Sequence, residues 1–374
     1  MKKLIVLIFA VFLLVLFPSF VLAEQNSNYD DVYKYSGAEQ IGDSLDSKTK
    51  DFLGGQDTNP TDYKWADALS TENVFSHIFS FLKDGAKTPF KAGFTVLGII
   101  LISAALGAFK REGDSEIYVN FAVTLAIISA VISGVWGSIN SAVSTVKSGS
   151  TFMLTFVPVY AGILSLSGAP ATAAVSGGML LGSAEFISSA AAFGLTSVIG
   201  AHLALSIGCA VSPFLNGFGI ADTFKKVGMW TMSLCTTVFL GVLSVQTAVN
   251  SAADTLNTKT AKFILGTCVP VAGTALSGAV TTVSASVSLL KSSVGIYGIV
   301  AVAVMFLPTL IELLMWRLVL TVSGGVCTAF SMDSTCKTLK AVDSMLSLLI
   351  GAILLIEAMF IISLSLTVNS GRAL

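Results

Sequence analysis

Charged residues are scarce in this sequence, and their scarcity excludes an ordinary soluble protein. Only 11% of the 374 residues are Asp, Glu, Lys or Arg, and 54% are hydrophobic, whereas a soluble chain has about 25% charged residues. Only 17 of the 43 charges lie beyond residue 116, so we expect this long C-terminal part to be a membrane domain. The net charge of -1 offers no basic surface, and no nucleic-acid partner is expected.

Reactive residues are also few. The five cysteines all lie beyond residue 200 without a Cys-x-x-Cys pair, which argues against a disulfide framework and against zinc. With only two histidines, the sequence contains neither a His-Glu-x-x-His helix nor a phosphate-binding loop that ends in Lys-Ser/Thr. We therefore expect no enzyme, no cofactor, and no catalytic or metal site.

The N-terminus has the pattern of an export signal. Lys2 and Lys3 precede an apolar run from Leu4 to Phe17, and Val21-Leu22-Ala23 suits signal peptidase. An uncleaved anchor is the alternative, although the run is shorter than the roughly 20 residues that span a bilayer. We interpret residues 1–23 as a signal peptide and residues 24–64, which are acidic and poor in apolar side chains at first, as an exported, flexible segment.

Residues 65–89 are predicted to form an amphipathic helix at the membrane surface. Phe75, Ile78, Phe79 and Leu82 recur at the spacing of one helix face. The alternative is a soluble helix packed on another subunit, but the nearby lysines suit contact with lipid headgroups; these are Lys83, Lys87 and Lys91.

Residues 90–137 contain the first two clear spans. The loop between them carries Lys110-Arg111, and short basic loops remain in the cytoplasm. This orientation agrees with an exported N-terminus, because one crossing leads from outside to inside. Further apolar stretches bring the expected total to six to eight spans.

The rest of the chain is predicted to be a duplication. Asn140-Ser141-Ala142 reappears as Asn250-Ser251-Ala252, and Val157-Pro158-Val159 reappears as Val269-Pro270-Val271. We therefore predict two membrane repeats with helix breaks at Pro158 and Pro270, a pattern typical of transporters and conduits. A duplication that only enlarged a packed bundle is the alternative. The predicted repeats are residues 138–249 and 250–374.

Ionisable residues inside apolar stretches are candidates for function because they are costly in a membrane. The candidates are Glu185, Glu312, Arg317 and Glu357. Glu312 and Arg317 are five residues apart, so on one helix they face different neighbours. Structural pairing inside the bundle is the alternative interpretation of all four charges.

The order of these segments resembles the stage III sporulation protein AE family. The resemblance covers essentially the whole chain and rests on Phe156-Val157-Pro158-Val159-Tyr160-Ala161-Gly162, followed by Ser167-Gly168-Ala169-Pro170. These motifs are structural, so the resemblance supplies no active-site residues. The expected fold class is an all-α polytopic membrane protein, a duplicated transmembrane bundle with proline-broken helices behind a short exported polar segment.

The resemblance implies a protein of the outer forespore membrane whose N-terminal segment is extracytoplasmic. It also implies partners, namely other membrane proteins of a secretion-like channel complex that links mother cell and forespore and is needed for late forespore development. Contact with the lipid bilayer and a possible oligomer complete the expected associations. The alternative function is a stand-alone, ion-coupled secondary transporter of a small solute.

Overall fold

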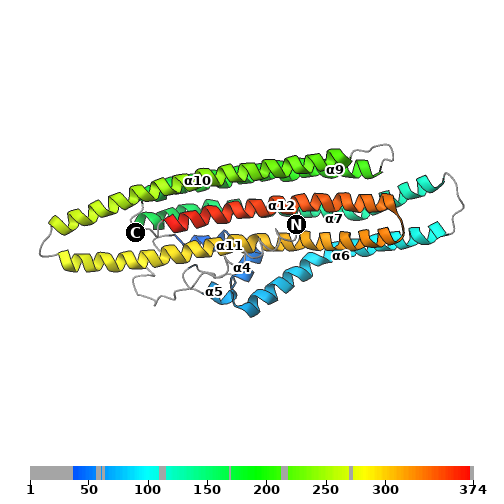
Figure 1. Ribbon diagram of the computed structural model, residues 1–374. Helices are drawn as coiled ribbons and strands as arrows, with labels where there is room; N and C mark the ends of the chain where they lie inside the picture. The colour runs from blue at the N-terminus through cyan, green and yellow to red at the C-terminus, as the bar shows by residue number, and fades with distance from the viewer. Residues whose placement is uncertain are drawn as a thin grey trace.

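The chain folds as a bundle of long α-helices (Figure 1). A computed structural model describes residues 37–55, 60, 64–108, 115–167, 170–211, 218–268 and 273–370. Those ranges contain no β-strand, so the predicted all-α class is confirmed. The predicted signal peptide, residues 1–23, lies outside the described residues.

In the described ranges, three short helices precede seven longer ones, and a π-helical segment, Gly194–Val198, joins α8 to α9. The helices are α3 (Glu39–Asp43), α4 (Ser47–Phe52), α5 (Lys64–Ala68), α6 (Thr71–Ala108), α7 (Ser115–Leu166), α8 (Pro170–Phe193), α9 (Ile199–Val211), α10 (Phe218–Cys268), α11 (Gly273–Ala329) and α12 (Asp333–Ser370).

Five of the described helices are long and apolar enough to cross a membrane, fewer than the six to eight spans predicted. The number is smaller because apolar stretches that look separate in the sequence join into single helices. Helix α7, for example, contains both 117–137 and 152–166. With 52 residues, α7 is about 78 Å long at 1.5 Å per residue, more than twice the roughly 30 Å of a bilayer core.

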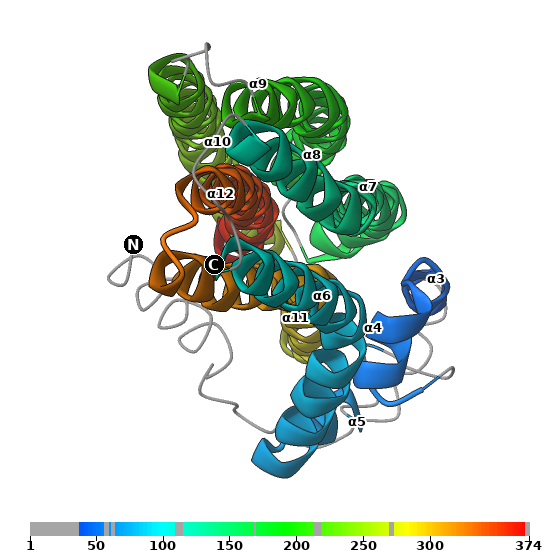
Figure 2. The same cartoon turned by 90° about the vertical axis from the view of Figure 1, so that its right-hand side faces the viewer.

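Helices α11 and α12 form the centre of the bundle, and their apolar windows are the most buried of the five candidate spans. Figure 2 shows α8, α9 and α10 on one side of α12, with α6 and α11 on the other. Helix α10 has the least buried window and lies at the edge of the bundle. The packed centre is therefore made by the C-terminal third of the chain.

Residues 37–55 correct the expectation that the predicted exported segment is flexible throughout. They form α3 and α4, and Ile41, Phe52 and Leu53 are buried in the same core as the long helices. The acidic composition concealed these apolar side chains, which cannot make a core alone but bury themselves against α7 and α11. Residues 24–36 lie outside the described part of the chain.

Helix α5 is attached to α11 through Trp65. The indole Nε1 of Trp65 donates to the carbonyl of Pro60 at 3.0 Å, and the Oγ of Ser293 donates to the same carbonyl at 2.6 Å. The Trp65 ring also meets Tyr297 edge-on. The segment 65–89 is therefore not an isolated helix on the membrane surface. Its larger part belongs to α6, which continues without interruption into the first span.

The predicted break at Pro158 is wrong, because α7 continues through this residue to Leu166. Proline removes only one backbone donor, and the buried side chains of Phe156, Val157 and Tyr160 hold both sides of it in the core. Pro270 lies outside the described residues. The duplication itself stays a prediction, and its proposed boundaries at 137/138 and 249/250 fall within α7 and α10.

Candidate functional site

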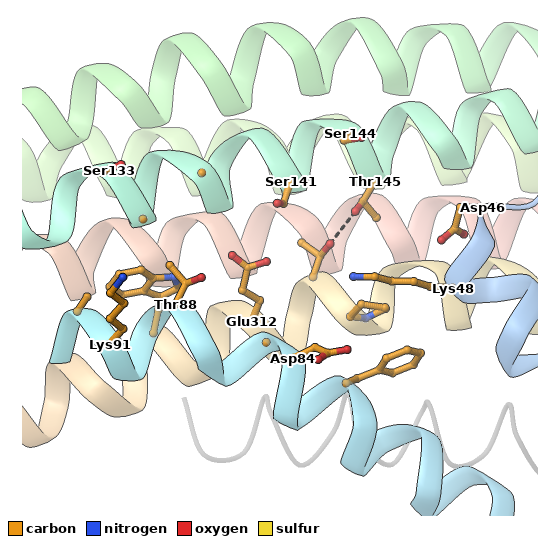
Figure 3. Close-up of a pocket in the computed structure, with 18 of the residues that line it drawn as sticks. Asp46, Lys48, Asp84, Thr88, Lys91, Ser133, Ser141, Ser144, Thr145 and Glu312 are labelled. Atoms are coloured by element: carbon orange, nitrogen blue, oxygen red, sulfur yellow. Dashed lines mark hydrogen bonds between the residues drawn. The ribbon is translucent and has the colours of Figure 1, made fainter. Parts of the chain in front are cut away.

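A polar cavity of about 890 Å³ lies between α4, α6, α7 and α11 (Figure 3). It is open to the surface on one side, and its lining combines nine hydroxyl groups with five charged side chains, an unusual composition between the helices of a membrane bundle. The hydroxyls belong to Ser47, Thr88, Thr95, Ser133, Ser141, Ser144, Thr145, Ser148 and Thr309. The charged residues are Asp46, Lys48, Asp84, Lys91 and Glu312.

Helix α7 supplies most of the hydroxyl groups because small polar residues recur on one of its faces. Ser133, Gly137, Ser141, Ser144 and Ser148 follow one another at intervals of three or four residues, the spacing of a single helix face. This pattern is visible in the sequence, but hydrophobic periodicity, on which the predicted spans rest, does not single out small polar residues.

Glu312 lies in the middle of the cavity and is held by the facing helix (Figure 3). The Oγ of Ser138 donates to Oε1 of Glu312 at 2.5 Å, and a second link joins the hydroxyls of Thr145 and Thr309 at 2.6 Å. These two links connect α7 to α11. Only one carboxylate oxygen has a bond among the described residues, so the other can accept from a ligand or water.

Glycine lets α6 approach α11 at the level of Glu312. A Cβ on Gly85 would lie 3.3 Å from the Cα of Glu312, and a Cβ on Gly93 would collide with Val319. Opposite, on α7, Gly134 leaves room for the ring of Trp316, whose buried Nε1 has no hydrogen-bond partner within the described ranges. These glycines bring three helices together around the cavity.

The charges of α4 and α6 lie along the cavity (Figure 3). Lys91 is at one end, whereas Lys48 and Asp46 are at the other. Asp84 is paired with Lys87 at 2.8 Å, but both side chains are more than half exposed, so this pair stabilises little. No ion pair to Glu312 occurs among the residues that the structure describes, which distinguishes it from Asp84.

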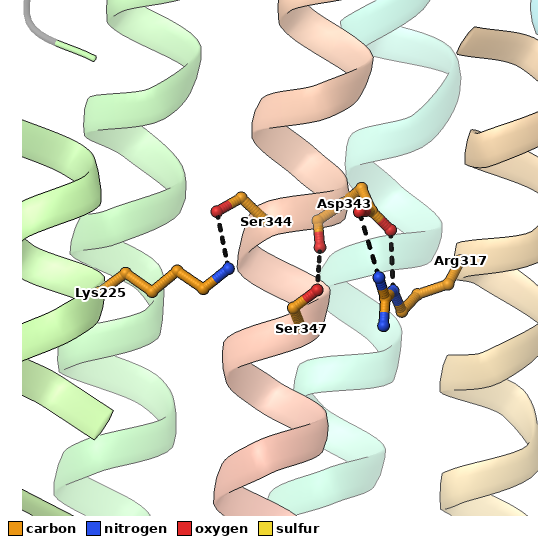
Figure 4. A network of polar contacts seen from close by, with 5 residues as sticks. All are labelled: Lys225, Arg317, Asp343, Ser344 and Ser347. Atoms are coloured by element: carbon orange, nitrogen blue, oxygen red, sulfur yellow. Dashed lines mark hydrogen bonds and ion pairs between the residues drawn. The ribbon is translucent and has the colours of Figure 1, made fainter. Parts of the chain in front are cut away.

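Arg317 belongs to a second polar cluster, where it pairs with Asp343 of α12 (Figure 4). Its Nε donates to Oδ1 of Asp343 at 2.9 Å. In the same region Nζ of Lys225 donates to Oγ of Ser344 at 3.1 Å, joining α10 to α12. Glu312 and Arg317 thus contact different helices, as their spacing predicts. Asp343 was not among the predicted charges, because it sits at the edge of a long apolar stretch.

The other two candidate charges lie apart from both clusters. Glu185 is exposed on α8, whereas Glu357 is buried in α12. Neither is joined to Glu312 or Arg317 by a hydrogen bond or an ion pair in the described part of the chain. The four predicted charges do not make one site, and Glu312 alone lines the cavity. The searched, described residues also contain no group of three or more His, Cys, Asp or Glu side chains that could hold a metal ion.

Comparison with known proteins identifies the family. The family model "Stage III sporulation protein AE" matches residues 64–371, which is most of the chain. The chain belongs to the stage III sporulation protein AE family. A relative of that name from Bacillus subtilis (strain 168) is 22% identical over 347 residues, which cover 92% of this chain and 84% of the relative. No solved structure matches.

Membership in the stage III sporulation protein AE family confirms the resemblance seen in the sequence. Together with the five apolar helices, it makes this chain a multi-pass membrane protein of sporulation. The cavity and the Arg317–Asp343 cluster are therefore features of a sporulation membrane protein.

Proposed function

We propose that this protein is a membrane component of a secretion-like channel complex that links mother cell and forespore and is needed for late forespore development. It resides in the outer forespore membrane and acts with other membrane proteins of that complex, without catalysing a reaction. Its N-terminal segment lies in the space between the two membranes.

The proposed assembly role rests on one observation, namely that part of the bundle projects beyond its apolar, membrane-spanning part. Helices α10 and α11 extend past the end of α12 in Figure 1. Lys225 of α10 bonds Ser344 of α12, and Thr236 bonds Met359 further along both helices, so the two helices run in parallel. Helix α12 ends at Ser370, level with about position 247 of α10. Helix α10 continues to Cys268, about 30 Å further at 1.5 Å per residue. A projection of that length offers a surface to partners outside the bilayer.

The distribution of lysines supports the proposed orientation. Helices α10 and α12 both begin at the right-hand end of the bundle in Figure 1, where α6 and α11 end. Lys225 and Lys226 lie near the start of α10, and Lys337 and Lys340 near the start of α12. Basic residues near the ends of spans favour the cytoplasmic side, which supports an extracytoplasmic projection at the opposite end, although the projection itself carries Lys259 and Lys262.

Compartment-specific expression tests this proposal. In the endospore former that encodes the chain, the gene is deleted and restored under a promoter active only in the mother cell or only in the forespore. We expect heat-resistant spores only with mother-cell expression, and we expect channel proteins to co-purify from those cells. Rescue from the forespore alone would contradict the proposed membrane, and purification without any partner would contradict the complex.

The cavity around Glu312 favours a second candidate, an ion-coupled transporter of a small solute. A carboxylate in a polar cavity within a membrane bundle is an arrangement found in ion-coupled carriers. The purified protein in proteoliposomes distinguishes the two functions. Solute uptake driven by an ion gradient, without partner proteins, would establish the transporter, whereas a component of a larger channel shows none.

A further inference from the structure

Helix α6 presents three different faces, and only one of them borders the cavity. Val96 and Ile100 are buried in the core. A second face is exposed and apolar, with Phe75, Phe79, Phe90, Phe94 and Leu101. The third face lines the cavity with Asp84, Thr88, Lys91 and Thr95, again at helical spacing. Lipid contact suits the second face, and water suits the third.

Helix α10 marks the height of the lipid belt. Its exposed apolar side chains recur every three or four residues, which makes a lipid-facing stripe along one side. They are Ile220, Phe224, Val227, Trp230, Leu234, Val238, Val242 and Val245. These 26 positions span about 38 Å at 1.5 Å per residue, slightly more than a bilayer core of about 30 Å.

Contacts between the helices place Glu312 at the middle of this belt. Phe306 packs against Phe360, and Arg317 pairs with Asp343, so Glu312 is level with the part of α12 between positions 343 and 360. The same part of α12 is level with positions 225–236 of α10, through the bonds of Lys225 to Ser344 and of Thr236 to Met359. Positions 225–236 are the centre of the α10 stripe.

Glu312 is thus a carboxylate at mid-membrane height that faces a hydroxyl-lined space and has no ion-pair partner among the described residues. Such a charge is costly in a membrane unless water or a cation stabilises it. The cavity has room for many water molecules, since each takes about 30 Å³ in the liquid. Hydroxyl oxygens of Ser141, Thr145 and Thr309 line the same space and can contribute lone pairs.

We propose that this cavity is a water-filled binding site for a small monovalent cation, an alkali-metal ion or a primary ammonium group, held against Glu312. Of the three lining carboxylates, Asp84 is paired with Lys87 and Asp46 accepts from Thr49. Glu312 with its neutral hydroxyls therefore matches a single positive charge, whereas divalent ions usually take several carboxylates or carbonyls. Lys48 and Lys91, which line the ends of the cavity, face the same water and disfavour a second cation there. The site is compatible with a channel component and with a carrier, so its test is separate from sporulation.

Cysteine labelling of the full chain in membrane vesicles tests both whether water enters the cavity and whether the charge of Glu312 attracts cations there. The five native cysteines are replaced by serine, and Ser141→Cys is then reacted with a cationic or an anionic methanethiosulfonate reagent. We expect Ser141→Cys to react and Val238→Cys, on the α10 stripe, to remain unreactive. Adding Glu312→Gln should lower the ratio of cationic to anionic rate constants about tenfold, whereas Glu185→Gln, on exposed α8 surface, should not change it.

Protection experiments identify the ion. Slower labelling of Ser141→Cys in sodium chloride than in choline chloride at equal ionic strength indicates an alkali-metal ion, and slowing by methylammonium chloride indicates an ammonium ligand. Protection by neither salt overturns the binding site. An unreactive Ser141→Cys in vesicles of both orientations would contradict the water-filled cavity. A rate ratio unaffected by Glu312→Gln would contradict the role of Glu312. Membrane abundance of each variant is measured first, so that loss of protein is not mistaken for loss of labelling.

Discussion

Ser138 of α7 donates a hydrogen bond of 2.5 Å to Glu312 of α11, across a separation of 174 residues in the sequence. This bond connects two long helices at the polar cavity and fixes one oxygen of the carboxylate. Because the acceptor is charged, the bond is stronger than a neutral one. The position of Glu312 therefore depends on a residue that hydrophobic patterning does not single out.

Replacing Ser138 by Ala should destabilise the bundle measurably. The substitution removes a hydrogen bond to a charged acceptor, a loss of up to about 1.5 to 3 kcal/mol that water in the cavity offsets only in part. We expect the midpoint of thermal unfolding in detergent to fall by several degrees. Ser141→Ala is the matched control, since Ser141 lines the same cavity, whereas the bond to Glu312 within the described ranges comes from Ser138. Equal midpoints for the two variants would show that the bond contributes nothing.

A pair of glycines on α7 gives a sharper test of packing. A Cβ on Gly134 would collide with the ring of Trp316, whereas a Cβ on Gly137 meets nothing within 4 Å. Gly134→Ala should cost about 1 to 3 kcal/mol through displacement of the indole. Gly137→Ala should be neutral or stabilising by up to about 1 kcal/mol, because alanine favours a helix. The measurement is thermal unfolding of both variants in detergent, and the reverse order would contradict this packing.

The all-α class, the membrane domain and the family could be predicted from the sequence because composition and segment order carry them. The cavity could not, because it needs side chains from four helices, and the pairing of Ser138 with Glu312 is set by tertiary register. Proline chemistry alone gives the wrong prediction at Pro158, where packing of neighbouring side chains keeps α7 continuous. Acidic composition likewise concealed the buried Ile41 and Leu53.

The ion pair between Arg317 and Asp343 should matter more than the pair between Lys87 and Asp84. Side chains of the first pair are 21% and 29% exposed, and those of the second are 68% and 57% exposed. Arg317→Ala leaves a partly buried carboxylate unpaired and should cost about 1 to 3 kcal/mol. Lys87→Ala should change stability by less than about 1 kcal/mol.

Charge exchange checks the origin of that difference. The double variant Arg317→Asp with Asp343→Arg should recover part of the unfolding midpoint and membrane abundance that Arg317→Ala loses. Failure of Arg317→Ala to lower either quantity would mean that the pair is as dispensable as the exposed one.

Substitution of the exposed phenylalanines of α6 tests whether that face contacts lipid. Phe75 and Phe79 are 69% and 70% exposed, so they contribute almost nothing to packing within the chain. If this face meets only water, Phe75→Asp with Phe79→Asp should be harmless or even favourable. If it meets lipid, each aspartate costs up to about 2.5 to 3.5 kcal/mol at the bilayer centre. We expect the lipid outcome, seen as reduced protein in the membrane fraction and reduced sporulation.

Asp43→Ala, which removes a highly exposed carboxylate on α3 with only a 3.9 Å contact to Lys50, is the control and should keep both at wild-type level. Normal membrane abundance with full sporulation for the double variant would remove α6 from the lipid belt, and with it the face that separates lipid from the cavity.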